Sequence, residues 1–343
     1  MSLKSDVKNR IKQYMMEKIF FSGKDFIKRT MDAFSVSDTT VYSLLKKLIA
    51  EGKVRKLANG EYELCSYVDK TFRYTTEGDD LSEDVIYNKS IKKYIDTLPD
   101  NVSRIWEYAF AEIMNNAIDH SDAKTIRVRI EQNAAYTCIS ISDDGIGIFE
   151  RIAGYFRYPE LSDAVLSLFK GKLTTKSETH SGEGIFFTSK AVDHFAARSS
   201  GLVFEQNNTE EKVYPGESSR KTKGTVIYMA LSNCSSRNLK DVFDQYANIE
   251  EGFVMTRVPI SYVSDSGFPV SRSQAKRLCF GLDNFEKAIL DFSGVDEIGQ
   301  GFADEVFRVF AKAHPSLSIE YENASPEVEK MIRHVTRSLG NKN

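Results

Sequence analysis

The segment 112–120 reads E-I-M-N-N-A-I-D-H and carries polar side chains at regular helical intervals. Glu112, Asn116 and Asp119 are spaced i, i+4 and i+7, so a helix places two carboxylates and an amide on one face. The apolar positions of the same helix form a neighbouring stripe that should pack on a sheet. The polar face is therefore either ordinary solvated surface or the floor of a site.

Three glycine-containing segments follow this helix. D-D-G-I-G at 143–147 ends an alternating strand, where glycines let the backbone turn sharply and approach a ligand closely. G-E-G at 182–184 is followed at once by a helical pattern, and helix N-termini hold phosphates on backbone N–H groups. K-G-T at 223–225 starts a buried strand. A lone D-x-G-x-G is a weak indication of a ligand site. The evidence for such a site is the order in which the three segments follow the helix.

In this order and spacing, residues 80–235 resemble the GHKL ATPase superfamily, which includes gyrase, the heat-shock 90 chaperones, histidine kinases and MutL. The resemblance implies an α/β sandwich, the Bergerat fold, that binds ATP with Mg²⁺. The sequence contains no Walker P-loop G-x-x-x-x-G-K-[ST], so this is the one nucleotide site that it indicates.

The resemblance assigns a role to each polar residue of the helix. Asn116 would ligate Mg²⁺ through its amide oxygen, within an octahedral shell of water and triphosphate. Glu112, one turn earlier, would be the general base that orients and deprotonates the attacking water. Asp119 or His120 would line the edge of the pocket.

The resemblance also assigns the remaining contacts to the nucleotide. Asp143 would accept a hydrogen bond from the adenine amino group, supported by Thr225 through water. Glycines would keep the pocket floor open and present backbone N–H groups to the phosphates; these are Gly145, Gly147, Gly182 and Gly184.

The stretch 149–181 would be the ATP lid, and its polar residues suggest mobility. Lys172 and Lys176 are candidate contacts to the γ-phosphate, although a solvated lysine in a flexible loop explains them equally well. His180 and His194 are 14 residues apart, which matches no spacing of metal ligands in a helix or turn.

Before these segments, the first 66 residues predict three helices and a hairpin. Apolar residues recur at helical spacing over 7–20 and 24–34. A third helix begins after Ser37, a preferred N-cap, and ends before Gly52. Two short alternating strands then flank an Asn-Gly dipeptide, which suits a tight turn.

Residues 5–65 thus resemble a winged helix-turn-helix, in which the third helix enters the major groove of duplex DNA and the wing meets phosphates. The third helix would present Thr39, Thr40, Tyr42, Ser43 and Lys46, and the wing would present Lys53, Arg55 and Lys56. The segment 1–66 holds 13 basic and 8 acidic side chains, a net charge of +5. The alternative is a module that docks protein and whose lysines are merely solvated.

The C-terminal residues resemble the STAS fold of anti-sigma-factor antagonists over 255–335. Those antagonists place a phosphorylatable Ser in the loop before a helix, whereas this loop reads I-G-Q-G at 298–301. Phosphorylation of this domain by its own ATPase domain is therefore not expected. A regulatory or partner-docking role stays open, as does a role only in dimerisation or in bracing the ATPase.

Composition agrees with this organisation. The chain has 343 residues, 41% hydrophobic and 28% charged, which is ordinary for a globular protein of two or three domains. It has neither an apolar run near the roughly 20 residues of a membrane span nor an apolar N-terminal region, so a cytoplasmic protein is expected. Its four cysteines are far apart and indicate neither disulfides nor zinc.

The sequence therefore predicts an α/β multidomain protein: a winged helix at 1–66, a linker at 67–79, a GHKL domain at 80–235 and a STAS-like domain at 236–343. We expect a regulator in which Mg–ATP, slowly hydrolysed, controls binding to double-stranded DNA or a protein partner. A protein serine kinase of the anti-sigma type is the alternative, and an adaptor with vestigial ATP binding is a third. The DNA site, the partner and the input signal are not encoded in recognisable form, and a homodimer stays open.

Overall fold

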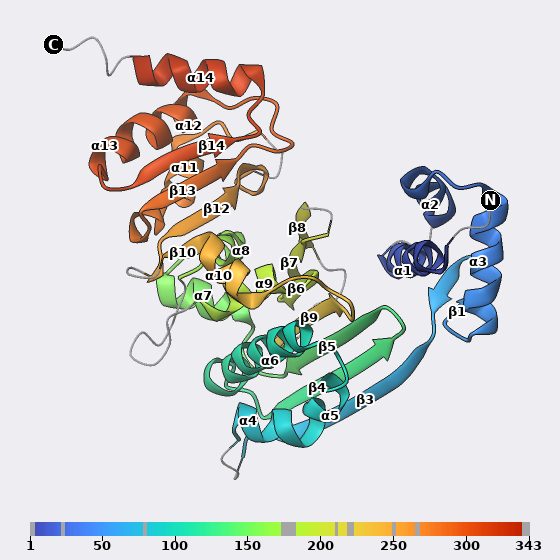
Figure 1. Ribbon diagram of the computed structural model, residues 1–343. Coiled ribbons are helices and arrows are strands. Elements are labelled where there is room, and N and C mark those ends of the chain that lie inside the picture. Colours follow the sequence, from blue (N-terminus) through green and yellow to red (C-terminus); the bar gives the residue numbers. More distant parts are fainter. Residues whose placement is uncertain are drawn as a thin grey trace.

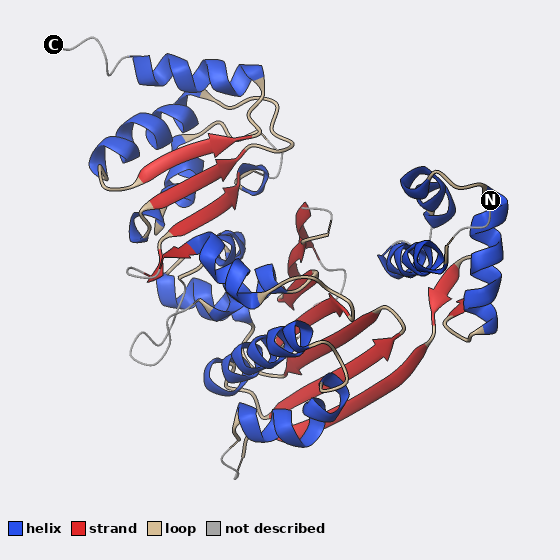
Figure 2. Cartoon of the chain, in the orientation of Figure 1, coloured by secondary structure: helices blue, strands red, loops and turns tan. Residues whose placement is uncertain are grey.

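The computed structural model describes residues 4–21, 25–77, 81–172, 183–209, 212–217, 223–248, 252–264 and 268–337. Figure 1 shows three parts that follow one another along the chain. Helices with a small hairpin come first, a seven-stranded sheet with its helices comes next, and a three-stranded sheet with its helices comes last, as the colours of Figure 2 make clear.

The N-terminal part has three helices, α1 (Ser5–Phe21), α2 (Phe26–Phe34) and α3 (Asp38–Ala50). Helix α3 begins where the sequence predicts, because the Ser37 hydroxyl accepts the N–H of Thr40 at 3.3 Å. It ends before Gly52, which has a φ of +69°. Strands β1 (Val54–Lys56) and β2 (Tyr62–Leu64) pair antiparallel and complete the order of elements of a winged helix.

The central sheet has the strand order β3-β4-β5-β9-β6-β7-β8, with every neighbouring pair antiparallel. Its strands are β3 (Ser66–Thr75), β4 (Thr125–Asn133), β5 (Tyr136–Asp143), β6 (His194–Ser199), β7 (Leu202–Asn207), β8 (Lys212–Glu217) and β9 (Thr225–Ser232).

The segment 67–79 is not the linker that the sequence suggested, because most of it belongs to strand β3, which pairs with β4. Val68, Phe72 and Tyr74 alternate along it and pack against the buried core. The residues between them are exposed, since β3 lies at the edge of the sheet and has one face to bury. Because only one face of β3 is buried and the other carries charged residues, its sequence is polar enough to resemble a linker.

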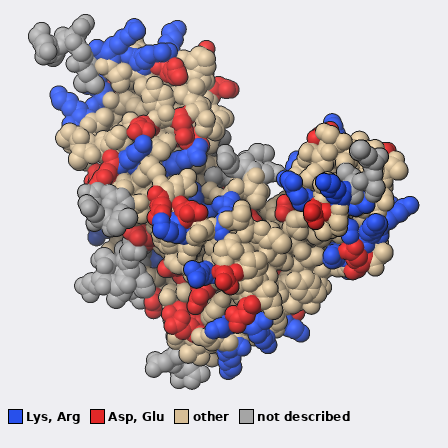
Figure 3. All heavy atoms as spheres, in the orientation of Figure 1, with Lys and Arg blue, Asp and Glu red and all other residues tan. Residues whose placement is uncertain are grey.

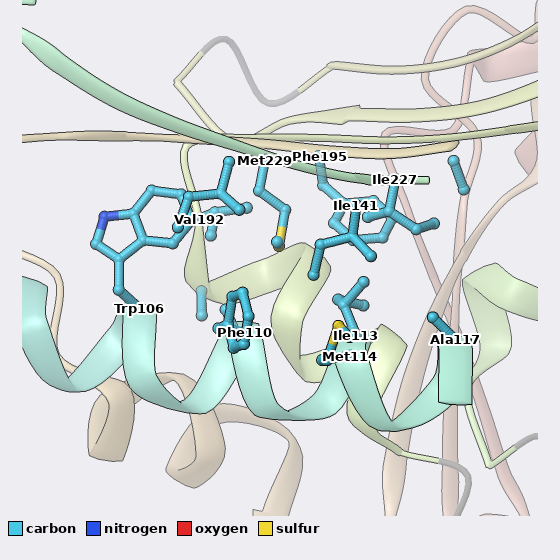
Figure 4. Packing of buried hydrophobic residues seen from close by; sticks show 14 of the residues in the cluster. Trp106, Phe110, Ile113, Met114, Ala117, Ile141, Val192, Phe195, Ile227 and Met229 are labelled. Carbon is cyan, nitrogen blue, oxygen red and sulfur yellow. The ribbon is translucent and has the colours of Figure 1, made fainter. Parts of the chain in front are cut away.

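Helices cover one face of this sheet. They are α4 (Glu83–Ile86), α5 (Lys92–Ile95), the π-helical turn Tyr87–Ile91 between them, and α6 (Asp100–His120). Figure 4 shows Trp106, Phe110 and Ile113 of α6 pointing at Ile141 and Met229 of the sheet. All five side chains are at most 2% exposed, so the apolar stripe predicted for this helix is the centre of the domain core.

Four further helices lie beside the sheet: α7 (Ile148–Phe156), α8 (Leu161–Lys170), α9 (Gly184–Ala191) and α10 (Leu239–Tyr246). Helix α8 and all of α7 except its first residue fall within the expected mobile lid, 149–181. Most residues of α8 are buried, and α7 contributes Phe149 and Ile152 to the core. This half of the expected lid is therefore packed structure, while 173–181 lie outside the described residues.

The C-terminal part has a parallel sheet in the order β12-β13-β14. Its elements are β12 (Met255–Pro259), α11 (Arg272–Cys279), β13 (Lys287–Asp291), α12 (Gln300–Asp304), the π-helical turn Glu305–Phe310, α13 (Ala311–Ala313), β14 (Ser318–Glu322) and α14 (Pro326–Arg337), with 3-10 turns at Ile260–Tyr262 and Leu282–Asn284. A two-residue pair, β10 (Ala247–Asn248) and β11 (Gly252–Phe253), joins it to α10. Alternating strands and helices give the α/β arrangement that the sequence indicated.

The N-terminal helices pack on the face of the large sheet that α6 leaves open. Phe20 of α1 stacks on Tyr136 of β5 with ring centroids 4.2 Å apart, and Phe21 meets the same ring edge-on at 5.3 Å. Cys138 and Ala230 of the sheet belong to the same apolar cluster as the N-terminal helices. Among the described residues, no helix has the length and apolar character needed to cross a membrane.

Candidate functional site

Helix α6 presents Glu112, Asn116 and Asp119 on one half-buried face, with half-buried His120 as its last residue. The side-chain nitrogen of Asn116 donates to the backbone carbonyl of Glu112 at 2.8 Å. This bond fixes the amide and leaves its oxygen as the atom available to a ligand. Amide oxygens suit hard cations such as Mg²⁺, so the residue fits the role that the sequence suggested.

Asp143, at the end of β5, is held by two backbone donors. The N–H groups of Gly145 and Thr225 donate to its Oδ1 at 3.0 and 3.3 Å. Burial raises the pKa of Asp143 to about 6, against the lowering effect of these two bonds. Both backbone bonds use Oδ1, and the Thr225 side chain also hydrogen-bonds to this carboxylate and lowers its pKa.

Glycines bring three segments together around Asp143. A Cβ on Gly145 would lie 2.0 Å from the backbone oxygen of Ser121, at the end of α6. A Cβ on Gly224, which has a φ of +76°, would lie 2.2 Å from the backbone oxygen of Asp143. A side chain at either position would push apart the strand end, the helix end and the start of β9.

Gly147 and Thr225 connect the same region to α7. The N–H of Gly147 donates to Glu150 Oε2, and the N–H of Ile148 donates to Thr225 Oγ1, both at 3.0 Å. Thr225, expected to support Asp143 through water, also contacts it directly through its N–H. Sequence reasoning missed Glu150, although a Glu three residues after a helix-capping position is a recognisable signal.

Glu112 also lies against the start of α9. A Cβ on Gly184 would be 1.9 Å from Glu112 Oε2, so a side chain at this position would displace the carboxylate. A carboxylate is favourable at a helix N-terminus, where backbone N–H groups lack partners within the helix. The structure thereby brings together the acid of α6 and the second glycine segment, which are 72 positions apart in the sequence.

Two of the expected phosphate contacts, Lys176 and Gly182, lie outside the described residues, as does His180. Lys172, the other lysine considered for the γ-phosphate, is engaged with the C-terminal part. Its ammonium donates to the backbone oxygen of Asn284 at 2.8 Å and lies over the ring of Phe285, both in the C-terminal part.

The expected DNA-contacting residues of α3 lie on its outer side. Thr39, Tyr42, Ser43 and Lys46 are exposed, and Thr40 is half-buried beside the N-cap. Lys and Arg side chains surround this part of the molecule in Figure 3, interspersed with acids.

The cations of the wing are partly neutralised. Lys53 pairs with Glu51 at 2.9 Å, Arg55 pairs with Glu63, and Lys56 lies over the ring of Tyr62. Phosphate contacts by Lys53 and Arg55 would have to compete with these pairs.

Comparison with protein-family models decides the nature of the central part. Residues 101–234 match the model described as "Histidine kinase-, DNA gyrase B-, and HSP90-like ATPase". The chain therefore contains a GHKL-type ATPase domain. The match spans the helix of Glu112 and Asn116, the strand of Asp143, the glycines and Thr225 of this ATPase domain, and it supports ATP binding.

A second model, "STAS-like domain of unknown function (DUF4325)", matches residues 274–329, so the C-terminal part is a STAS-like domain. No curated protein matches the chain. Among solved structures, an IclR transcriptional regulator from Alicyclobacillus acidocaldarius is 15% identical over 69% of this chain and 91% of that chain, with a TM-score of 0.21. A likeness this distant says nothing further about the ATPase domain or its neighbours.

Proposed function

We propose that the protein is a regulator in which Mg–ATP bound to the GHKL domain controls binding to duplex DNA or to a protein partner. The observation that carries this proposal is the pairing of two half-sites within the matched domain. One is the half-buried Asp143, whose carboxylate is fixed by the N–H groups of Gly145 and Thr225, and the other is the α6 face of Glu112 and Asn116.

Each polar residue of the site would have its own role in ATP binding or hydrolysis. Asp143 would accept the adenine amino group, and Asn116 Oδ1 would ligate Mg²⁺, which neutralises phosphate charge. Glu112 would orient the attacking water and accept its proton, as a general base does in phosphoryl transfer. Its place against Gly184 holds this carboxylate at the N-terminus of α9.

Two elements connect the nucleotide residues with the outer domains. Strand β5 ends at Asp143 and begins at Tyr136, which stacks on Phe20 of the N-terminal helices. Helix α9 begins at Gly184, against Glu112, and its Phe187 packs against Phe253 at the start of the STAS-like domain. Nucleotide binding at Asp143 and Glu112 would therefore act on elements that touch both neighbours.

A purified-protein assay tests the proposal. Phosphate release without added substrate, together with DNA binding that changes with ATP, would support the regulator. Transfer of label to a co-expressed partner would instead support the serine kinase. Absence of both activities would support an adaptor.

Within the STAS-like domain, Gly299 packs so closely on Val270 that an added Cβ would lie 2.6 Å from the Val270 backbone. That loop lacks a hydroxyl, so a kinase substrate would be sought in trans.

A further inference from the structure

The face of the large sheet opposite α6 carries a row of arginines. The register places Arg73 of β3 opposite Arg127 of β4, and Arg127 opposite Ser142 of β5. The same row continues through Val226 of β9 to Arg198 of β6. Paired residues of neighbouring strands point to the same side of a sheet, so the three guanidinium groups share one face.

This arginine row (Arg73, Arg127 and Arg198) is exposed, and the described residues include no ion pair to any of its members. By contrast, the next row toward the winged helix is neutralised: Arg129 pairs with Asp69 at 2.9 Å and with Glu131 at 3.0 Å. The acids that surround the arginine row are therefore engaged elsewhere.

The nearby acids on other strands are also occupied. Glu205 lies close enough to Arg198 to feel its charge, but its carboxylate bonds to His194 at 2.7 Å. Asp144 Oδ1 accepts the N–H groups of Lys124 and Thr125, each at 2.9 Å. In the described part of this face, no carboxylate forms an ion pair with the row, and Glu205 is shared with His194.

Such an arrangement is costly without a partner. Arg73 and Arg127 are directly opposite each other, which puts their Cβ atoms about 4.5–5.5 Å apart, and like charges at this position destabilise a sheet. A polyanion would convert this repulsion into binding energy by releasing its own counterions. Arginine in particular suits phosphate, because its planar fork matches the phosphate oxygens.

The spacing of the row suits a DNA duplex. Three strand spacings separate Arg127 from Arg198, roughly 14 Å at about 4.8 Å each. The major groove is about 12 Å wide, so the side chains of Arg127 and Arg198 can reach phosphates on both of its sides. The winged helix packs on the other end of the same face, against Tyr136 and Cys138, so the arginine row and the winged helix lie on one side of the sheet.

We propose that the arginine row is a second DNA-contacting surface, which binds the phosphate backbone of the duplex beside the segment held by the winged helix. This inference rests on the proposed function, because it takes duplex DNA as the ligand. It adds to that function a sequence-independent contact made by the ATPase domain itself.

The test measures the salt dependence of DNA affinity for the full chain. Arg73→Gln, Arg127→Gln and Arg198→Gln are combined in one variant. Loss of three phosphate contacts should flatten the plot of log affinity against log salt by about 2.7, at roughly 0.9 per contact. A control with Lys89→Gln, Lys92→Gln and Lys93→Gln removes the same charge from exposed positions on the helices of the opposite face and should leave the slope unchanged.

Duplex length separates the two surfaces. A duplex of about one helical turn, roughly 10 base pairs, should engage the winged helix alone, so the arginine variant should bind it like the wild type. A duplex of about 30 base pairs should show the full difference. An equal slope for the variant and the wild type on the long duplex, with binding still present, would overturn the arginine row alone. Absence of DNA binding by the wild type would overturn both the row and the DNA part of the proposed function.

Discussion

At the scale of single residues, the Asp143 carboxylate is expected to decide adenine binding. Asp143→Asn keeps the shape of the side chain but removes the charge from its hydrogen bond to the adenine amino group. Hydrogen bonds to charged groups contribute about 1.5–3 kcal/mol, so ATP affinity should fall roughly 10- to 150-fold. Calorimetry measures this directly, and unchanged affinity would mean that adenine lies elsewhere.

The same substitution should remove a pH dependence. Since burial raises the pKa of Asp143 to about 6, the ATP-free protein holds this proton below that pH and loses the charged acceptor. ATP affinity of the wild type should rise as the pH increases through about 6. Protonation of the phosphates affects wild type and Asp143→Asn alike, so the difference between their two profiles reports the carboxylate.

Glu112 is expected to act on turnover and not on binding. Glu112→Gln is isosteric and so fits against Gly184 as the acid does, but it cannot accept a proton. ATP affinity should stay within a few-fold of wild type, while phosphate release should fall by about 10²–10⁴. Asn116→Ala serves as a contrast, because it should weaken binding only when Mg²⁺ is present. Hydrolysis that survives in Glu112→Gln would assign the base to another group.

The residues of the site could be selected from sequence because their spacing is local. Glu112 and Asn116 are one helical turn apart, and Asp143 and Gly145 share one strand end. What the pattern could not show is contact between segments. The approach of Gly184 to Glu112 depends on how α9 packs on α6, and no local periodicity encodes that packing.

At the scale of elements, the sequence predicts those helix and strand ends that depend on neighbouring residues. It does not predict elements whose burial depends on contacts with distant parts of the chain. The N-cap of Ser37 and the positive φ of Gly52 fix both ends of α3 within the sequence itself. Strand β3 was missed because an edge strand alternates against only one buried face. The sequence does not predict the burial of helix α8, because that burial depends partly on residues of the C-terminal part: Thr256, 86 positions later, donates to the backbone oxygen of Lys170.

The contact of α1 with β5 is expected to stabilise the position of the winged helix. Phe20 and Tyr136 stack at 4.2 Å, and aromatic pairs contribute about 0.5–1.5 kcal/mol beyond the area that they bury. A double-mutant cycle with Phe20→Leu and Tyr136→Leu should give a coupling free energy of that size. Denaturant unfolding of the four proteins measures it, and strictly additive losses would mean that the stacking contributes nothing.

At the scale of the whole molecule, the ATPase and STAS-like domains share one apolar cluster. Leu166 of α8 and Phe186 of α9 belong with Val258 and Leu290 of the C-terminal sheet. Phe186 lies 4.6 Å from Phe253 between ring centroids. Such continuity means that the two domains should unfold together, because separating them would expose this apolar area to water.

A buried lysine links the ATPase domain to the STAS-like domain by hydrogen bonds. The ammonium of Lys170, at the end of α8, donates to the backbone oxygens of Arg277 and Phe280 at 3.0 and 2.9 Å. Burial lowers its pKa from 10.5 to about 8. Between these two pH values the unfolded chain holds a proton that the folded protein has lost, so this group makes stability rise with pH across that window.

Lys170→Met should lower the slope of unfolding free energy against pH by up to about 1.4 kcal/mol per pH unit between pH 8 and 10.5. Lys312→Met, at an exposed position, should leave the slope as in the wild type. Parallel curves for all three proteins would show that Lys170 keeps its proton when folded, with the two carbonyl bonds outweighing its burial.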